Sequence, residues 1–228
     1  MTPLRRVVAA GTGVLLLALG ALSLRYGGSA ALSDAGALRA QWVVSEWRAE
    51  RGPAFSPELW LQTRDSLNRA AATTPDNAHL FDDLGFMHAA RAQGMGEPEP
   101  NSSAWVYKQT LLVQSIESYR AATRLRPTFP YSWVYLALAK HQMGEQDAEF
   151  WLAFDKALCF GRHEAGVQPA LAEMAFAHWR ALGAQRQQLV DEMVATAQPA
   201  QRHRLMGQAA RSGVVLPKAA ALPINAAL

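Results

Sequence analysis

The sequence contains a single cysteine, Cys159, so the chain cannot form an internal disulfide bond. It also lacks runs in which Val, Ile or Thr alternate with polar residues, the pattern of half-buried strands. Alanine, leucine and arginine are the commonest residues instead, and all three favour helices. The 228 residues, half of them hydrophobic, suffice for one domain with a continuous apolar core. We therefore expect an all-α protein in which Cys159 is a small buried side chain near a packed helix end.

Sequence signatures of catalysis are also missing. The chain has no HExxH, paired CxxC, GxGxxG, P-loop or GxSxG motif, and its six histidines show no metal-binding spacing. Cys159 and His163 stand four residues apart and could form a nucleophile–base pair, but no neighbouring residue supplies an orienting group or an oxyanion site. We expect no catalytic residue, no metal site and no cofactor. An enzyme with an unrecognised site is the alternative from another functional class.

Acidic residues are absent from both ends of the chain. The first 25 residues contain Arg5, Arg6 and Arg25 but no Asp or Glu. The residues after Gln198 also contain basic side chains but no Asp or Glu. All 19 acidic residues lie between Asp34 and Glu192, so the body is mildly acidic although the sequence pI is about 9.2. A nucleic-acid-binding domain needs a basic face on the folded body. The charge distribution therefore argues against a nucleic-acid partner.

An uncharged run near the amino terminus indicates a membrane segment. Residues 7–24 carry no charge, and as a helix they would extend about 27 Å, close to the roughly 30 Å hydrocarbon core. Arg5 and Arg6 before the run favour a cytoplasmic amino terminus and an exported remainder. A cleaved signal peptide is the alternative, because Gly28-Ser29-Ala30 resembles a cleavage site, but the run exceeds a usual h-region. We expect residues 1–25 to form a retained single-pass anchor and residues 26–33 a linker, with the body in the periplasm of a bacterium.

Two short phrases alternate along residues 63–160. One is an apolar residue with alanine three positions later and proline eight positions later; its copies are Leu67–Ala70–Pro75, Tyr119–Ala122–Pro127 and, without the proline, Phe154–Ala157. The other is an aromatic residue, leucine three later and then a tiny residue; its copies are Phe81–Leu84–Gly85 and Trp133–Leu136–Ala137. Tiny residues let a partner helix approach closely, and proline cannot continue a helix. The phrases thus predict stacked helical hairpins.

These phrases resemble the tetratricopeptide (TPR) repeat, whose first helix carries Trp-x-x-Leu-Gly and whose second carries Ala, an aromatic, Ala and a closing Pro. The resemblance implies an irregular α-solenoid of antiparallel helical hairpins over residues 34–212. Pro75 and Pro127 are about 52 residues apart, against roughly 34 in the family, so a loop near residues 94–103 and a lengthened following helix are inserted. Residues 213–228 are expected to be a flexible basic tail. Helices are expected near 34–51, 56–73, 77–93, 104–126, 130–143, 146–160, 165–182, 184–197 and 199–212.

The resemblance also implies a protein-binding groove. In tetratricopeptide arrays the first helices line a concave surface, using positions that flank the aromatic–leucine phrase. Transferred to this chain, those positions are His79, Asp82, Phe86, Tyr131, Val134, Leu138 and His141. Family members that clamp a peptide carboxylate use lysine and asparagine there, so a carboxylate clamp is not expected.

Together these features predict a non-catalytic, membrane-anchored scaffold or adaptor that binds membrane or periplasmic proteins from the bacterial inner membrane. The overall format also resembles the small tetratricopeptide proteins of bacterial exopolysaccharide gene clusters, the VpsP type. That resemblance implies a role in polysaccharide biosynthesis or export. An assembly factor for another envelope complex, such as cytochrome c maturation, is the alternative within the same class.

Overall fold

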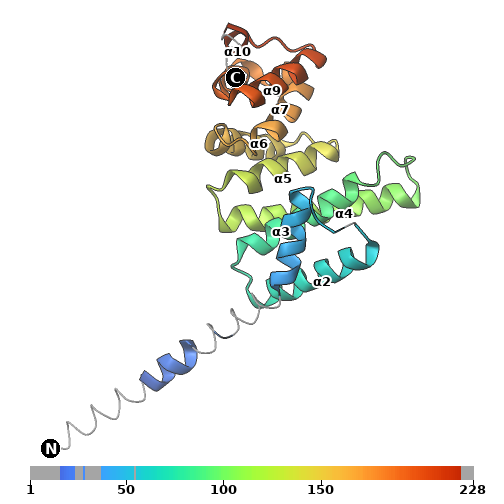
Figure 1. Cartoon of the computed structure of the whole chain (residues 1–228), viewed down its shortest axis with the longest axis vertical. Coiled ribbons are helices and arrows are strands. Elements are labelled where there is room, and N and C mark those ends of the chain that lie inside the picture. The colour runs from blue at the N-terminus through green and yellow to red at the C-terminus, as the bar shows by residue number, and fades with distance from the viewer. Residues whose placement is uncertain (1–15, 24–27, 29–36, 54, 222–228) are drawn as a thin grey trace, which may run out of the picture. The chain divides into compact units, whose positions relative to one another are not determined.

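The computed structural model describes residues 16–23, 28, 37–53 and 55–221 (Figure 1). Within these ranges every regular element is a helix, which confirms the expected all-α class. The described residues up to Asp83 form one compact unit, and those from Leu84 onward form a second. A single domain over residues 34–212 stays a prediction, because each unit is described by itself. From residue 37 onward the helices are residues 37–48, α2 (Pro57–Thr73), α3 (Ala78–Gln93), α4 (Ser103–Leu125), α5 (Pro130–Gln142), α6 (Ala148–Gly161), α7 (Gln168–Ala177), α8 (Gly183–Thr196), α9 (Pro199–Arg211) and α10 (Pro217–Ala221), with a 3-10 turn at Trp179–Ala181.

Helix boundaries follow local chemistry that the sequence displays. Ser56 precedes α2 and accepts a hydrogen bond from the Leu59 amide at 3.1 Å, and Asp147 caps α6 in the same way through the Phe150 amide at 2.9 Å. α2, α5, α7 and α9 have proline in the first turn, where a missing amide hydrogen costs nothing. Gly213 has a positive φ of 67° just after α9, the conformation that glycine tolerates best. These signals explain why most boundaries agree with expectation.

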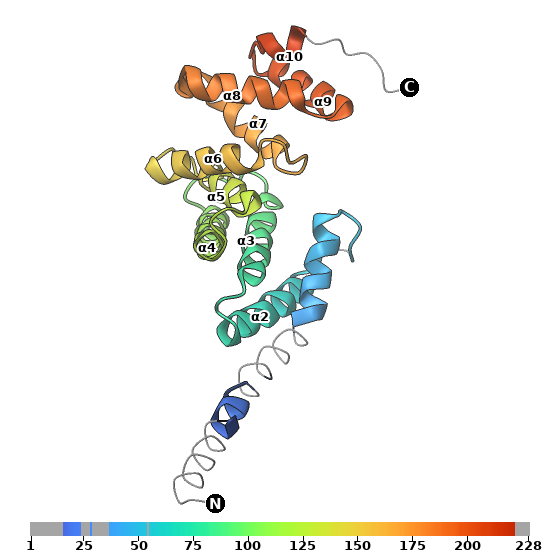
Figure 2. The ribbon, with the colours of Figure 1, turned by 90° about the vertical axis from the view of Figure 1, so that its left-hand side faces the viewer.

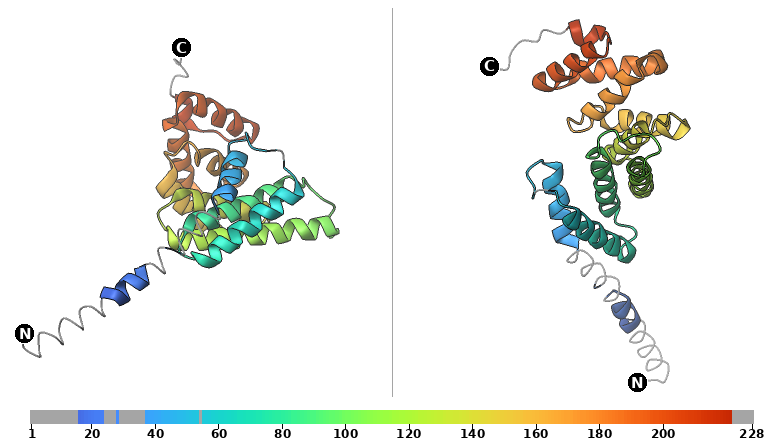
Figure 3. Two further views of the ribbon diagram at one scale, coloured as in Figure 1. Left: turned by 60° about the horizontal axis from the view of Figure 1, so that its bottom comes forward. Right: turned by 90° about the vertical axis from the view of Figure 1, so that its right-hand side faces the viewer.

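In the first unit, the helix of residues 37–48 packs beside α2, as Figure 3 shows. The inward face of this helix consists of the buried residues Ala37, Ala40, Val43 and Val44. Its end is joined to α3 by Arg48, whose guanidinium contacts the Asp83 carboxylate at 2.7 Å and the Asp82 carbonyl at 3.0 Å. Burial raises the pKa of the Asp83 carboxyl, and the Arg48 charge opposes that rise.

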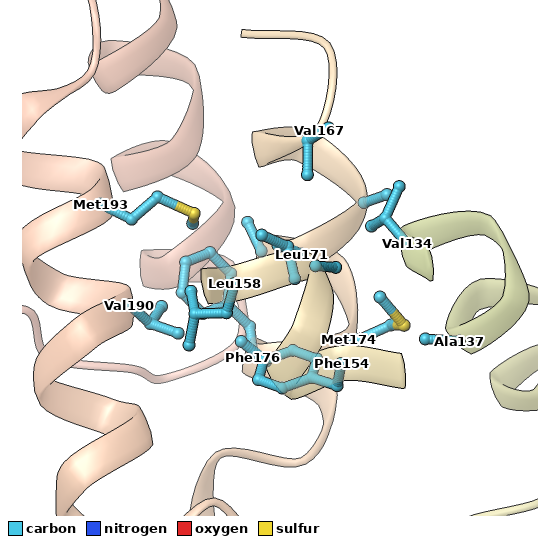
Figure 4. Packing of buried hydrophobic residues seen from close by; sticks show 14 of the residues in the cluster. Val134, Ala137, Phe154, Leu158, Val167, Leu171, Met174, Phe176, Val190 and Met193 are labelled. Atoms are coloured by element: carbon cyan, nitrogen blue, oxygen red, sulfur yellow. The ribbon is translucent and has the colours of Figure 1, made fainter. Parts of the chain in front are cut away.

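In the second unit, consecutive helices pack as antiparallel pairs that stack along the chain (Figure 2). α5 contacts α4 and α6, and α7 contacts both α5 and α9, so the first helices of successive pairs lie next to one another. This connectivity is that of a helical solenoid. The core between the pairs holds side chains from α5, α6, α7 and α8 (Figure 4).

The tiny residues of the sequence phrases lie at helix contacts. A Cβ atom on Gly85 would stand 2.8 Å from the ring of Tyr119, and Ser115 donates a 2.9 Å hydrogen bond to the Gly85 carbonyl. α3 and α4 are therefore in direct contact at this point. Ala122, Leu136, Ala137, Phe154 and Ala157 are also buried, whereas Trp133 is half-buried against the core. The hairpin interpretation of the two phrases is confirmed here.

Lys140, near the end of α5, is buried yet charged. Its ammonium lies 2.7 Å from Glu145, 3.0 Å from Asp147 and 3.0 Å from Glu149, and Glu149 also receives two hydrogen bonds from Arg120. Burial by itself would lower the pKa of Lys140, but the three carboxylates outweigh it and raise that pKa. The Phe150 amide and Lys140 lower the pKa of Asp147, and Arg120 and Lys140 lower that of Glu149. This cluster fixes the turn between α5 and α6.

The carboxyl-terminal region differs from expectation. The helix expected over residues 165–182 ends at Ala177 and continues only as a 3-10 turn. The tail expected to be flexible from residue 213 instead forms α10, because Asp191 accepts hydrogen bonds from the Lys218 and Ala219 amides at 2.8 and 2.9 Å. Val214, Leu216 and Ala219 are buried, so this segment is part of the fold as far as the structure describes it.

The amino-terminal segment is described only in part. Residues 16–23 of the expected anchor are helical, whereas the rest of residues 7–24, most of the 26–33 linker and residues 222–228 lie outside the described residues. None of the helices in the described ranges is both long enough and apolar enough to cross a bilayer.

The contact at Gly85 predicts the outcome of a matched pair of substitutions. Gly85→Ala should lower the free energy of unfolding by about 1–3 kcal/mol, because its methyl group must displace the Tyr119 ring. Gly207→Ala, in α9, should raise it by about 0.5–1 kcal/mol, because a Cβ there meets only the Arg211 side chain at 3.7 Å. Denaturant unfolding of both variants measures the two signs. Equal effects of the two substitutions would contradict a close α3–α4 contact.

The Lys140 cluster predicts a dependence of stability on pH. Asp147 and Glu149 have folded-state pKa values below their ordinary 3.8 and 4.5, so their contribution is present above those values and is lost as pH falls through the lowered ones. Thermal unfolding between pH 7 and pH 3 should show this loss. Lys140→Met should lower stability at pH 7 by about 1–3 kcal/mol, less than for a fully buried pair because the carboxylates are partly exposed. Lys140→Met should also weaken the dependence of stability on pH between pH 7 and pH 3, whereas the control Lys156→Met should leave it unchanged. If stability falls with pH equally in Lys140→Met and in the parent, the cluster does not have this role.

Candidate functional site

The seven expected groove residues are divided between the two units. His79 and Asp82 belong to the first unit, and Phe86, Tyr131, Val134, Leu138 and His141 belong to the second. Asp82 and Val134 are buried, so neither offers a surface contact as the groove hypothesis requires. Val134 instead lies in the apolar core with Val167 and Leu171 (Figure 4). His79 is exposed, and the remaining four residues are half-buried.

The half-buried residues of α5 have different surroundings. Tyr131, at the start of α5, packs against Gly166, whose Cβ would lie 2.9 Å from the Tyr131 hydroxyl, and its ring centroid is 5.3 Å from that of Phe129. Leu138 lies three residues before His141, so the two occupy one face of the helix. Of the expected groove residues on α5, those available to a partner are therefore Tyr131 at one end and Leu138 with His141 at the other.

His141 is paired with His178, the residue that ends α7. His141 Nδ1 and His178 Nε2 are 2.9 Å apart, a hydrogen bond that requires one ring to donate and the other to accept. Burial lowers the pKa of both imidazoles, and for His178 the neighbouring His141 lowers it further. Both rings are thus neutral at physiological pH, and the pair joins the first helices of two successive hairpins.

Aromatic rings of α6 pack against the His178 side of this pair. The centroid of His178 lies 5.6 Å from that of Phe150 and 6.3 Å from that of Trp151, and Phe150 and Trp151 meet edge to face at 4.8 Å. Aromatic pairs of this geometry add packing energy of about 0.5–1.5 kcal/mol each beyond area burial. Phe150 is buried, whereas Trp151 remains half-exposed and can contact a partner.

Trp151 continues the arrangement toward α8. The Arg186 guanidinium lies 4.8 Å from the Trp151 ring centroid and forms two parallel hydrogen bonds with Asp155, at 2.6 and 2.7 Å. The carboxylate raises the pKa of Arg186, which stays charged. Stacking and bidentate pairing hold the guanidinium in one orientation. We call His141, His178, Trp151, Arg186 and Asp155 the α5–α8 row.

A pocket of about 540 Å³ adjoins the Asp155–Arg186 end of this row. Its apolar lining includes Leu158, Leu182 and Leu189, and the first residues of α8 line it as well. The amide hydrogens of a first helical turn have no partner within the helix. The combination of an ion pair, free amides and apolar walls suits an extended peptide better than a single small anion.

Cys159 also lines this pocket and is exposed, so the expectation that it is buried is wrong. The preceding residue on α6, Leu158, lines the same pocket but is buried. His163 is exposed too, and no hydrogen bond joins it to Cys159 although the structure describes both residues. The geometry therefore gives no support to a nucleophile–base pair.

The histidines of the row do not form a metal centre with their neighbours. Among the described residues, no three His, Cys, Asp or Glu side chains gather as a metal ion would require. The two imidazoles of the α5–α8 row have no third ligand beside them in the part of the chain that the structure describes.

Sequence reasoning found His141 but not its four partners in the row. His178 lies 37 residues after His141, close to the family period of roughly 34 residues, so aligning the ends of successive first helices could have suggested the pair. Asp155 and Arg186 are 31 residues apart on the second helices of adjacent hairpins. Without a repeat signature in residues 165–197, nothing in the sequence connected them.

Comparison with known proteins supports the fold. No protein-family model matches the sequence, and no curated protein matches it. Among solved structures, the chain is similar to the crystal structure of TTC0263, a thermophilic TPR protein of Thermus thermophilus, with a TM-score of 0.52 and 19% sequence identity. The match covers 90% of this chain and 96% of that one. At this identity the likeness concerns the fold, and the fold of this chain is a TPR-like helical solenoid.

Proposed function

We propose that the chain is a non-catalytic scaffold that binds a protein partner through the α5–α8 row and the adjoining pocket. The observation that carries this proposal is the stack of helical pairs shared with a TPR protein, a fold that mediates protein–protein interaction. The row adds a half-exposed aromatic ring and a preoriented charge pair, and tryptophan and arginine dominate the energetics of protein interfaces.

We further propose that residues 7–24 anchor the chain in a bacterial inner membrane and that its body lies in the periplasm. The support is the uncharged run and the preceding Arg5 and Arg6. The partner would then be a membrane or periplasmic protein, and the format resembles proteins that act in exopolysaccharide biosynthesis or export. The tail after residue 221 carries no charged side chain and has no assigned part in this function.

Exchanging the two charges of the row tests the interface while keeping its ion pair. In the double variant Asp155→Arg/Arg186→Asp, an intramolecular pair can still form but its charges are reversed toward a partner. We expect chemical cross-linking in intact membranes, read by mass spectrometry of the full-length chain, to lose its specific partner at least tenfold. A complex of polysaccharide export would support the proposed pathway, whereas a haem-lyase partner would assign the chain to cytochrome c maturation.

The first unit offers a matched control for this exchange. Arg64 pairs with Asp65 at 2.7 Å and its guanidinium lies 5.1 Å from the Trp60 ring centroid, a similar stacked pair. The variant Arg64→Asp/Asp65→Arg should keep the cross-link. Retention of the cross-link in both exchanged variants would rule out the α5–α8 row as the interface, and its loss in Cys159→Ser alone would point to chemistry at the pocket.

Reporter fusions test the topology. Alkaline phosphatase fused after Leu228 should be active, because it requires export, and a cytoplasmic reporter at the same position should be inactive. Mass spectrometry of the mature amino terminus distinguishes the anchor from a signal peptide. A chain starting at Met1 or Thr2 supports the anchor, and a chain starting near Ala31 replaces it with cleavage.

A further inference from the structure

A second, smaller pocket lies within the first unit, between the helix of residues 37–48 and α2. Its volume is about 190 Å³, room for about six water molecules and of the size of a phosphate group with its ester substituents. Its lining consists of Arg39, Ala40, Val43, Leu59, Gln62, Thr63, Ser66 and Arg69. Figure 3 shows the two helices that form it.

The charges of this pocket are of one sign. Arg39 and Arg69 line it, and no acidic side chain does. Five other arginines of the described chain pair with carboxylates; they are Arg48, Arg51, Arg64, Arg120 and Arg186. By contrast, the guanidinium groups of Arg39 and Arg69 form no ion pair or hydrogen bond within the described part of the chain. Two unneutralised guanidiniums at one concavity create a site for an anion.

Phosphate suits the donors of this pocket. The planar guanidinium presents paired N–H donors that match two phosphate oxygens, and it binds phosphate in a fixed orientation. The Gln62 side chain, exposed at the same wall, adds amide donors. A carboxylate would also be attracted, but a tetrahedral phosphate can engage guanidiniums from two helices at once.

Apolar side chains stand beside the arginines and indicate where the phosphate comes from. Leu38 and Trp42, one turn apart on the helix that carries Arg39, are 62% and 55% exposed. Tryptophan is enriched at the interface between lipid headgroups and acyl chains, and basic side chains there attract anionic lipid. A free phosphate in solution would give no reason for two large apolar side chains to remain exposed next to its site.

We propose that this pocket binds the phosphate group of an anionic lipid headgroup, with Leu38 and Trp42 in contact with the membrane interface. The inference rests on the proposed anchor only for proximity. Residues 25–36 connect the expected span to this helix and can reach at most about 40 Å, which keeps the pocket near the bilayer surface. The first unit would thus contact the membrane surface through this pocket.

The test uses the full-length chain in lipid nanodiscs of two compositions, phosphatidylcholine alone and phosphatidylcholine with phosphatidylglycerol, each with brominated acyl chains. The difference in fluorescence between the parent and Trp42→Phe isolates Trp42 from the other tryptophans. Bromine should quench this difference signal at least twofold more in the discs with phosphatidylglycerol. Arg39→Gln/Arg69→Gln should abolish that excess, and Arg39→Lys/Arg69→Lys should keep part of it, because lysine retains the charge without the planar donors.

Two controls make the result specific. Arg124→Gln/Arg204→Gln removes the same charge from exposed positions of the second unit and should leave the quenching unchanged. The exchanged variant Asp155→Arg/Arg186→Asp should also leave it unchanged, so failure of the partner interface and failure of the lipid site are distinguishable. Circular dichroism of each variant verifies that the fold is intact.

Inorganic phosphate added to the detergent-solubilised chain separates the two sources of phosphate. A rise in melting temperature that requires Arg39 and Arg69, without lipid-dependent quenching, would overturn the lipid assignment in favour of a soluble phosphate. Equal quenching in both lipid compositions, unaffected by the arginine substitutions, would overturn the proposal entirely. If the mature chain starts near Ala31, the same comparison is made by sedimentation with vesicles of the two compositions.

Discussion

The second unit depends on helices that approach more closely than ordinary side chains allow. At Gly85 the Tyr119 ring occupies the space where a methyl group would be, and at Gly161 the Pro130 ring of α5 stands 2.5 Å from the position of a Cβ. At each of these contacts the two helices of one pair lie close together, and the neighbouring pair packs against them. The position of the α5–α8 row follows from this stacking, because its five members come from helices of two pairs.

The sequence predicted the bounds and buried positions of the helical hairpins better than it predicted which side chains lie on the surface. Tiny residues, prolines and caps act locally, so the bounds of most helices and the burial of Ala122 and Ala137 could be read from spacing alone. The surface depends on the rotation of each helix about its axis. One turn along α5 separates the buried Val134 from the half-exposed Leu138, and the family resemblance placed both in one groove. Contacts between residues far apart in the sequence, such as Asp155 with Arg186, left no local trace.

Arginine pairing distinguishes the two candidate sites chemically. In the α5–α8 row the guanidinium is already neutralised by Asp155 and stacked on Trp151, so a partner meets an oriented dipole and an aromatic edge. In the pocket beside residues 37–48, the two guanidiniums have no carboxylate partner among the described residues and are open to an anion from outside. The first arrangement favours specificity for a protein surface, and the second favours affinity for an anion.

The cap that Asp191 gives to α10 limits how the solenoid can grow. A repeat stack exposes an apolar face at its last pair, and such a face invites another copy to continue the array. Here the chain turns back after Gly213 and covers α8 with Val214, Leu216 and Ala219, while one carboxylate holds the covering segment by two backbone amides. The last described pair therefore has its apolar face covered by the segment that follows it, so this face is not open for another copy to pack on.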